Sequence, residues 1–123
     1  MKVLLSIKPE YAKKIFSGEK KFEFRKIEFK NQFVHTIVVY ATMPVGKIIG
    51  EFNIKKIHKD FLDAIWAKTK NHSGIDEAFF YEYYNGKDYA IAIEVDKPQL
   101  YDMPINPKER FKNFAAPQSF KYL

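Results

Sequence analysis

The chain contains no cysteine, which excludes disulfide bonds, thiol chemistry and zinc sites built on thiolates. It also has no apolar run that approaches the ~20 residues needed by a membrane-spanning helix. Residues Met1 to Leu5 are too few for the apolar segment of a secretory signal peptide. These absences predict a cytoplasmic protein with no membrane partner.

Metal and cofactor motifs are absent as well. The three histidines, His35, His58 and His72, have no His-x-x-x-His spacing, and no cysteine is available to complete a ligand set. The sequence has neither a glycine-rich phosphate-binding loop nor a nucleophile elbow. We therefore expect no metal site and no cofactor.

Aromatic residues and lysines are abundant. The 123 residues include 12 Phe and 8 Tyr, and 46% of the chain is hydrophobic, which predicts one folded domain over residues 1–123. The net charge is +6 and the pI is about 9.4. Such a charge favours binding to RNA or a nucleotide, is compatible with DNA, and is also explained by solubility alone.

Short strands alternate with helices along the chain. We predict strands at residues 2–7, 22–29, 35–41, 47–57 and 89–95, from runs that alternate or are rich in β-branched residues. One helix begins at Pro9 and ends at Gly18, one has Asp60 as its N-cap, and another ends near Tyr84. Four of the six prolines lie after Lys97, so residues 98–123 are expected to form a tail that wraps the domain. Five to six strands with helices between them predict an α+β fold, a small and partly closed mixed β-barrel.

The segment from Ser17 to Arg25 combines a turn with an alternating strand. Phe22 and Phe24 point to one face, and Glu23 and Arg25 point to the other at a backbone separation of about 6.5–7 Å. An ion pair between them could leave guanidinium donors free for a phosphate, or Glu23 could accept hydrogen bonds from the exocyclic amine of a base. Lys20 would supply charge, or act as a base if burial lowered its pKa. The structural alternative is a surface ion pair that contributes about 0–1 kcal/mol.

Three further residues are candidate ligand contacts. Ser6 and Lys8 share a face of the first strand, where Ser6 could lie on the floor of a cleft or be satisfied by neighbouring backbone. Tyr40 could stack on a base, which contributes about 1–3 kcal/mol, or could pack in the barrel.

The N-terminal residues resemble the signature of the ASCH domain, a family in the PUA-like superfamily of small RNA-associated β-barrels. The resemblance is carried by Ser6-Ile7-Lys8-Pro9, Tyr11-Ala12, Ile15 and Gly18-x-Lys20-x-x-Glu23-Phe24-Arg25. It implies a cleft beside the barrel that is lined by Lys20, Glu23 and Arg25 and that accepts RNA or a nucleotide.

One branch of that family hydrolyses an acetylated cytidine with the motif Lys, a Thr and a distant Glu. Lys20 matches that branch, but Glu23 stands where the branch has Thr, and Glu51, Glu77 and Glu82 are all candidates for the distant carboxylate. We therefore interpret the chain as a binding module for RNA or a nucleotide. The alternatives are an amidohydrolase acting on a modified nucleoside, a ribonuclease in which Lys20 and Glu23 activate water, and a small protein-interaction domain.

Overall fold

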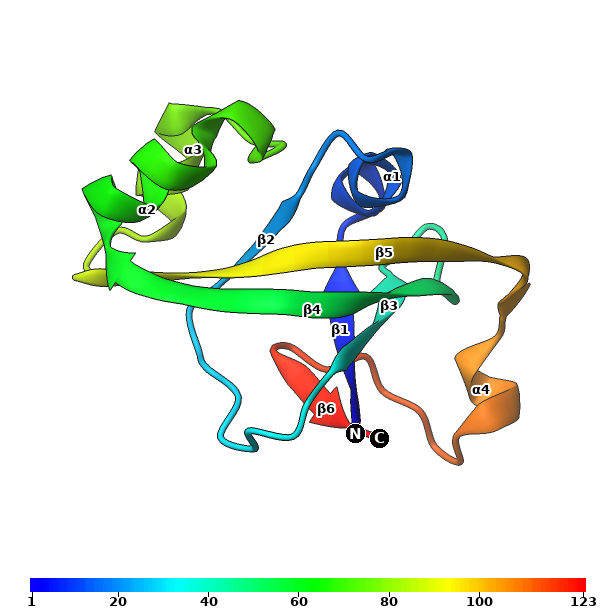
Figure 1. The fold of residues 1–123 in the computed structure, drawn as a ribbon. Coiled ribbons are helices and arrows are strands. Elements are labelled where there is room, and N and C mark those ends of the chain that lie inside the picture. Colours follow the sequence, from blue (N-terminus) through cyan, green and yellow to red (C-terminus); the bar gives the residue numbers. More distant parts are fainter.

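The computed structural model describes all 123 residues, which form one six-stranded sheet with helices inserted between the strands (Figure 1). In chain order the elements are β1 (Lys2–Ile7), α1 (Pro9–Ser17), β2 (Phe22–Arg25), β3 (Thr36–Ala41), β4 (Lys47–Phe61), α2 (Leu62–Thr69), the 3-10 turn η1 (Lys70–His72), α3 (Glu77–Tyr83), β5 (Tyr89–Ile105), α4 (Pro107–Arg110) and β6 (Phe120–Tyr122).

The strands follow the order β2-β5-β4-β3-β1-β6 across the sheet. β1 pairs with β3 in parallel, and every other neighbouring pair is antiparallel. The long strands β4 and β5 run side by side across the molecule, and the sheet curls around them into a half-barrel (Figure 1). This mixed, curled sheet with helices confirms the predicted α+β class.

Helix α1 has the boundaries that its sequence predicts. Pro9 occupies the first turn, where a missing N–H costs nothing, and Gly18 ends the helix in the left-handed conformation with its N–H donated to Ile15 O. α2 and α3 pack together over the end of the sheet where β4 and β5 join them (Figure 1). None of the helices is long and apolar enough to cross a membrane.

The buried side chains form three clusters. The first lies between α1 and the middle of the sheet, around Leu5, Ile15 and Phe52. The second lies under α2 and α3 and is centred on Phe80, which is fully buried. The third lies where Tyr40 meets Phe114 from the C-terminal segment. The helices that flank the site described below are therefore fixed by apolar packing against the sheet.

Four element boundaries differ from the sequence predictions. β4 continues past the predicted residue 57 to Phe61. β2 ends at Arg25, because the Tyr84 hydroxyl accepts from Ile91 N and donates to Arg25 O (3.3 and 2.9 Å) in place of the next ladder bond. Asp60 is not an N-cap, because it still pairs with Ala90 in the β4–β5 ladder. β5 continues through Pro98 to Ile105, because the proline lies at an irregularity between Asp96 and Gln99, where no N–H is needed. The segment after β5 then turns through α4 and returns to pair β6 with β1.

The N-terminus of α3 carries a side-chain cap. Asp76 accepts a hydrogen bond from Phe79 N at 2.8 Å. Replacing Asp76 with Ala should lower the free energy of unfolding by about 1 kcal/mol, because the N–H loses its partner. Urea denaturation of the wild type and the variant measures this difference. Asp76→Asn is the matched control, since asparagine caps equally well, and a loss as large as that of the alanine variant would contradict the assignment.

Candidate functional site

A cavity of about 260 Å³ opens between β1, the start of α1, β2 and α3. Ser6, Lys8, Lys20, Glu23 and Arg25, five of the six residues proposed from the sequence, all line it. The rest of the lining is mainly apolar or aromatic and consists of Ile7, Tyr11, Phe24, Ile75, Phe79, Tyr83 and Gln118. The fold thus brings the charged groups of the N-terminal signature together with rings from α1 and α3.

Lys20 is a buried cation with only 2% of its surface exposed. Its Nζ donates to Ser73 O at 2.6 Å and lies 4.8 Å from the centre of the Phe24 ring. The loop that supplies this carbonyl approaches closely, and a Cβ on Gly74 would lie 2.6 Å from the Lys20 side chain. Gly74 also has a positive φ of 70°, so this approach requires glycine.

Burial lowers the pKa of Lys20 to about 8, because the charged form loses its hydration. The nearby Glu23 carboxylate acts in the opposite direction, and Lys14 lowers the pKa further. The amine therefore remains protonated near neutral pH but loses its proton under mildly alkaline conditions. A lysine of this kind can donate hydrogen bonds to a ligand or accept a proton from one.

Glu23 and Arg25 form a largely buried ion pair rather than a surface one. Arg25 Nη1 lies 3.4 Å from Glu23 Oε2, and the two side chains are 13% and 8% exposed. Strand alternation directs both toward the cavity, as the sequence predicts, while Phe24 packs against Phe80. Burial at this level rules out the description as a solvated surface pair.

Three of the five N–H donors of the Arg25 guanidinium are engaged by the protein itself. Its Nη2 donates to Ser119 O at 2.6 Å, and its Nη1 also donates to Ser6 O at 3.4 Å. The Ser6 hydroxyl donates to Pro117 O at 2.8 Å, so the alternative in which backbone satisfies this hydroxyl is the one observed. Together these bonds hold the segment 117–119 against the cavity, with Gln118 in its wall.

The rings of the cavity wall were not singled out as site residues from the sequence. Tyr11 faces Phe79 with ring centres 5.9 Å apart, and Phe79 stacks on Tyr83 at 6.4 Å. Their spacing on α1 and α3 is that of ordinary core positions, so only the fold distinguishes them. Gln118 reaches the site from 93 residues beyond Arg25, within the ending Pro117-Gln118-Ser119-Phe120-x-Tyr122, which resembles that of some ASCH members but does not by itself place it in the cleft. Among the rings of the cavity wall, Tyr11 and Phe24 are part of the resemblance to the ASCH signature.

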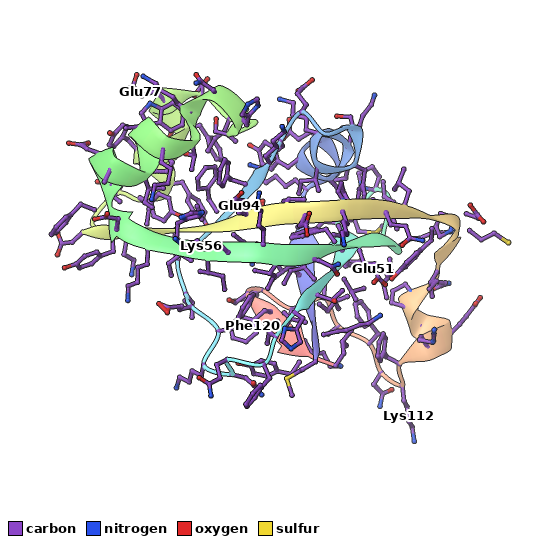
Figure 2. All side chains as sticks on the ribbon, in the orientation of Figure 1. Glu51, Lys56, Glu77, Glu94, Lys112 and Phe120 are labelled. Atoms are coloured by element: carbon purple, nitrogen blue, oxygen red, sulfur yellow. The ribbon has the colours of Figure 1, made fainter.

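Four other residues considered from the sequence lie elsewhere. Tyr40 is 6% exposed and packs against Phe114, because alternation along β3 directs it toward the third apolar cluster. Glu51 lies on β4 and accepts a hydrogen bond from the Tyr101 hydroxyl at 2.6 Å. Glu77 and Glu82 are exposed on α3, and Figure 2 shows Glu77 on the outer side of that helix. Glu23 is therefore the one carboxylate in the cavity wall.

Comparison with known proteins agrees with the resemblance of the N-terminal residues to the ASCH signature. The family model of the ASCH domain matches residues 5–99. The chain belongs to the ASCH domain family. The crystal structure of ASCH from Zymomonas mobilis superposes with a TM-score of 0.92 at 30% identity, covering 99% of this chain and 87% of that one.

Two relatives of this ASCH domain differ in how much of their length the domain covers. It is 31% identical to an ASCH domain-containing ribonuclease of Zymomonas mobilis, covering 98% of this chain and 82% of that protein. It is 30% identical to the large ribosomal subunit protein uL22 of Ureaplasma parvum. That match covers 98% of this chain but only 39% of the relative.

The pKa of Lys20 makes stability depend on pH in a defined direction. Below about pH 8 the lysine is protonated in both states, and the folded state bears the full cost of burying the charge. Between that value and the ~10.4 of an unfolded lysine, the unfolded state binds more protons, so the stability of the native state rises with pH. We expect the free energy of unfolding of the wild type, relative to Lys20→Met, to increase by about 2 kcal/mol from pH 7 to about 9.5. Urea titrations of both proteins across this range measure it, and a flat difference would contradict the burial of a charged amine.

Removal of one partner of the Glu23–Arg25 pair should be strongly destabilising. We expect Arg25→Met to lower the free energy of unfolding by about 3–5 kcal/mol, because buried Glu23 loses its ion-pair partner and the carbonyls of Ser6 and Ser119 lose a donor. The double variant with Glu23→Gln should recover part of that loss, since no charge is then stranded. A double-mutant cycle by chemical denaturation measures the coupling. A cost below about 1 kcal/mol for the single variant would indicate a solvent-screened pair instead.

Proposed function

We propose that this ASCH domain binds RNA or a nucleotide by accepting a single base in the cavity beside Lys20, Glu23 and Arg25. The observation that supports this best is the combination of a largely buried carboxylate–guanidinium pair and a buried ammonium with a ring-lined cavity. Buried charges are costly to a fold, so their arrangement around a cavity is expected where a ligand uses them.

The size and lining of the cavity favour a base over a larger ligand. Its volume of about 260 Å³ is below the ~300–1,000 Å³ that is usual for sites of drug-sized ligands. Tyr11, Phe79 and Tyr83 offer ring faces and edges, and stacking on an aromatic side chain contributes about 1–3 kcal/mol per base. The Glu23 carboxylate can accept hydrogen bonds from an exocyclic amine, which favours bases that carry one.

A second candidate function is RNA cleavage, which is favoured by the likeness to the Zymomonas mobilis ribonuclease. In that case Glu23 would act as a general base, and the Lys20 ammonium would stabilise developing negative charge. The hydrolysis of an acetylated nucleoside is less well supported, because Glu51, Glu77 and Glu82 all lie outside the cavity. That chemistry would lack the second carboxylate of the hydrolase branch.

The binding function is tested with Glu23→Gln, which keeps the shape of the side chain but removes its charge. We expect this variant to bind its preferred ribonucleoside about 10- to 100-fold more weakly, as for the loss of a hydrogen bond to a charged group. Isothermal titration calorimetry with the four ribonucleosides measures the affinities. Glu77→Gln is the matched control, because Glu77 is exposed on α3 (Figure 2) and does not line the cavity.

The same proteins separate binding from cleavage. Incubation of end-labelled RNA with wild type and with Glu23→Gln shows whether strand scission occurs and whether it depends on the carboxylate. Scission that is lost in Glu23→Gln but retained in Glu77→Gln would favour the ribonuclease. Absence of binding to any nucleoside and to a diverse RNA pool would overturn the proposed function.

A further inference from the structure

The cations within the cavity are already engaged by the protein itself. Lys20 Nζ is buried and donates to Ser73 O. Arg25 distributes its donors over Glu23 Oε2 and the carbonyls of Ser6 and Ser119. Both cations are largely buried, and the bonds to Glu23 and the carbonyls fix the direction of part of their donors. Exposed cations at the rim of the cavity are better placed to meet a phosphodiester backbone than these largely buried ones.

Two exposed lysines stand at that rim. Lys8 directly follows β1 and lines the cavity on the side of α1. Lys26 directly follows β2, and its Nζ lies 4.5 Å from the centre of the Tyr83 ring, which forms the wall on the side of α3. Neither ammonium forms an ion pair with a carboxylate in the structure. Both are available to an incoming anion.

We propose that Lys8 and Lys26 hold successive phosphates of a single-stranded RNA that crosses the mouth of the cavity while one base enters it. This inference rests on the proposed function and extends it from a free nucleotide to a strand. Lys26 belongs to neither the charged signature nor the cavity lining, and its place is set by its contact with Tyr83. That contact also steadies the Tyr83 ring, because a cation above an aromatic face is attracted to it.

A single strand fits this arrangement better than a duplex. The cavity has room for about one base, and a base must leave its stack and its pair to enter a pocket of this kind. In a single strand that cost is smallest, and the flanking phosphates remain outside, where the two exposed ammonium groups can meet them.

The test is a salt titration of RNA binding. Fluorescence anisotropy with a labelled single-stranded RNA of about eight nucleotides gives the affinity at a series of salt concentrations. For single strands the slope of log K against log salt is about −0.7 per neutralised phosphate, so Lys8→Gln/Lys26→Gln should reduce its magnitude by about 1.4. The affinity of the double variant should fall about tenfold or more at low salt. Both lysines are exposed, and thermal melting confirms that the variant is folded.

A matched pair of lysines controls for net charge. Lys56 on β4 and Lys112 after α4 (Figure 2) are exposed and do not line the cavity, so Lys56→Gln/Lys112→Gln should keep the wild-type slope. If both double variants change the slope equally, the charge acts diffusely and the inference is wrong. If RNA binds with an unchanged slope in Lys8→Gln/Lys26→Gln while nucleosides still bind, the inference fails and the proposed function stands. If the wild type binds neither nucleosides nor RNA, both fail.

Discussion

The Arg25 guanidinium joins the two ends of the sheet. β2 and β6 are the edge strands, and no ladder connects them. Arg25 on β2 spans the gap with its bonds to Ser6 O on β1 and Ser119 O just before β6. A planar group with five fixed donors suits this task, because it can serve several acceptors from one position. The half-barrel is thus closed at this point by a side chain and not by backbone pairing.

The same guanidinium sets the chemistry of the cavity. It holds the Glu23 carboxylate toward the cavity. Its bond to Ser119 O also fixes the segment 117–119, which brings Gln118 into the cavity wall. The buried ammonium of Lys20 is near enough to Glu23 to interact with its charge and is held by the carbonyl of Ser73. Well-packed apolar side chains in place of these three charged ones would often leave the stability of the fold unchanged or raise it. The retention of the charged side chains is consistent with a site that is organised before a ligand arrives, with little reorganisation on binding.

Local sequence patterns predicted the part of this site that is contiguous in the chain. The glycine turn and the alternation of Phe22 to Arg25 placed Glu23 and Arg25 on one face, because strand geometry has a strict period of two. The burial of Lys20 was not predictable, since it depends on a loop around Gly74 that is distant in sequence. The packing of Tyr40 and the place of Gln118 depend on the C-terminal segment for the same reason. The boundary of β5 was missed because Pro98 is an apparent strand breaker, and only the partner strand shows that the ladder is irregular there.

The hydrogen bond from the Ser6 hydroxyl to Pro117 O joins residues that are 111 positions apart. Ser6 lines the cavity, so the seam, the set of bonds from Ser6 and Arg25 to residues 117–119, forms part of the cavity wall. A ligand that contacts both sides of the seam stabilises the joined form by mass action. Conversely, a change that breaks these bonds would weaken ligand binding by the same free energy. Under the proposed function, binding in the cavity would therefore also stabilise the contacts between β2, β1 and the C-terminal segment.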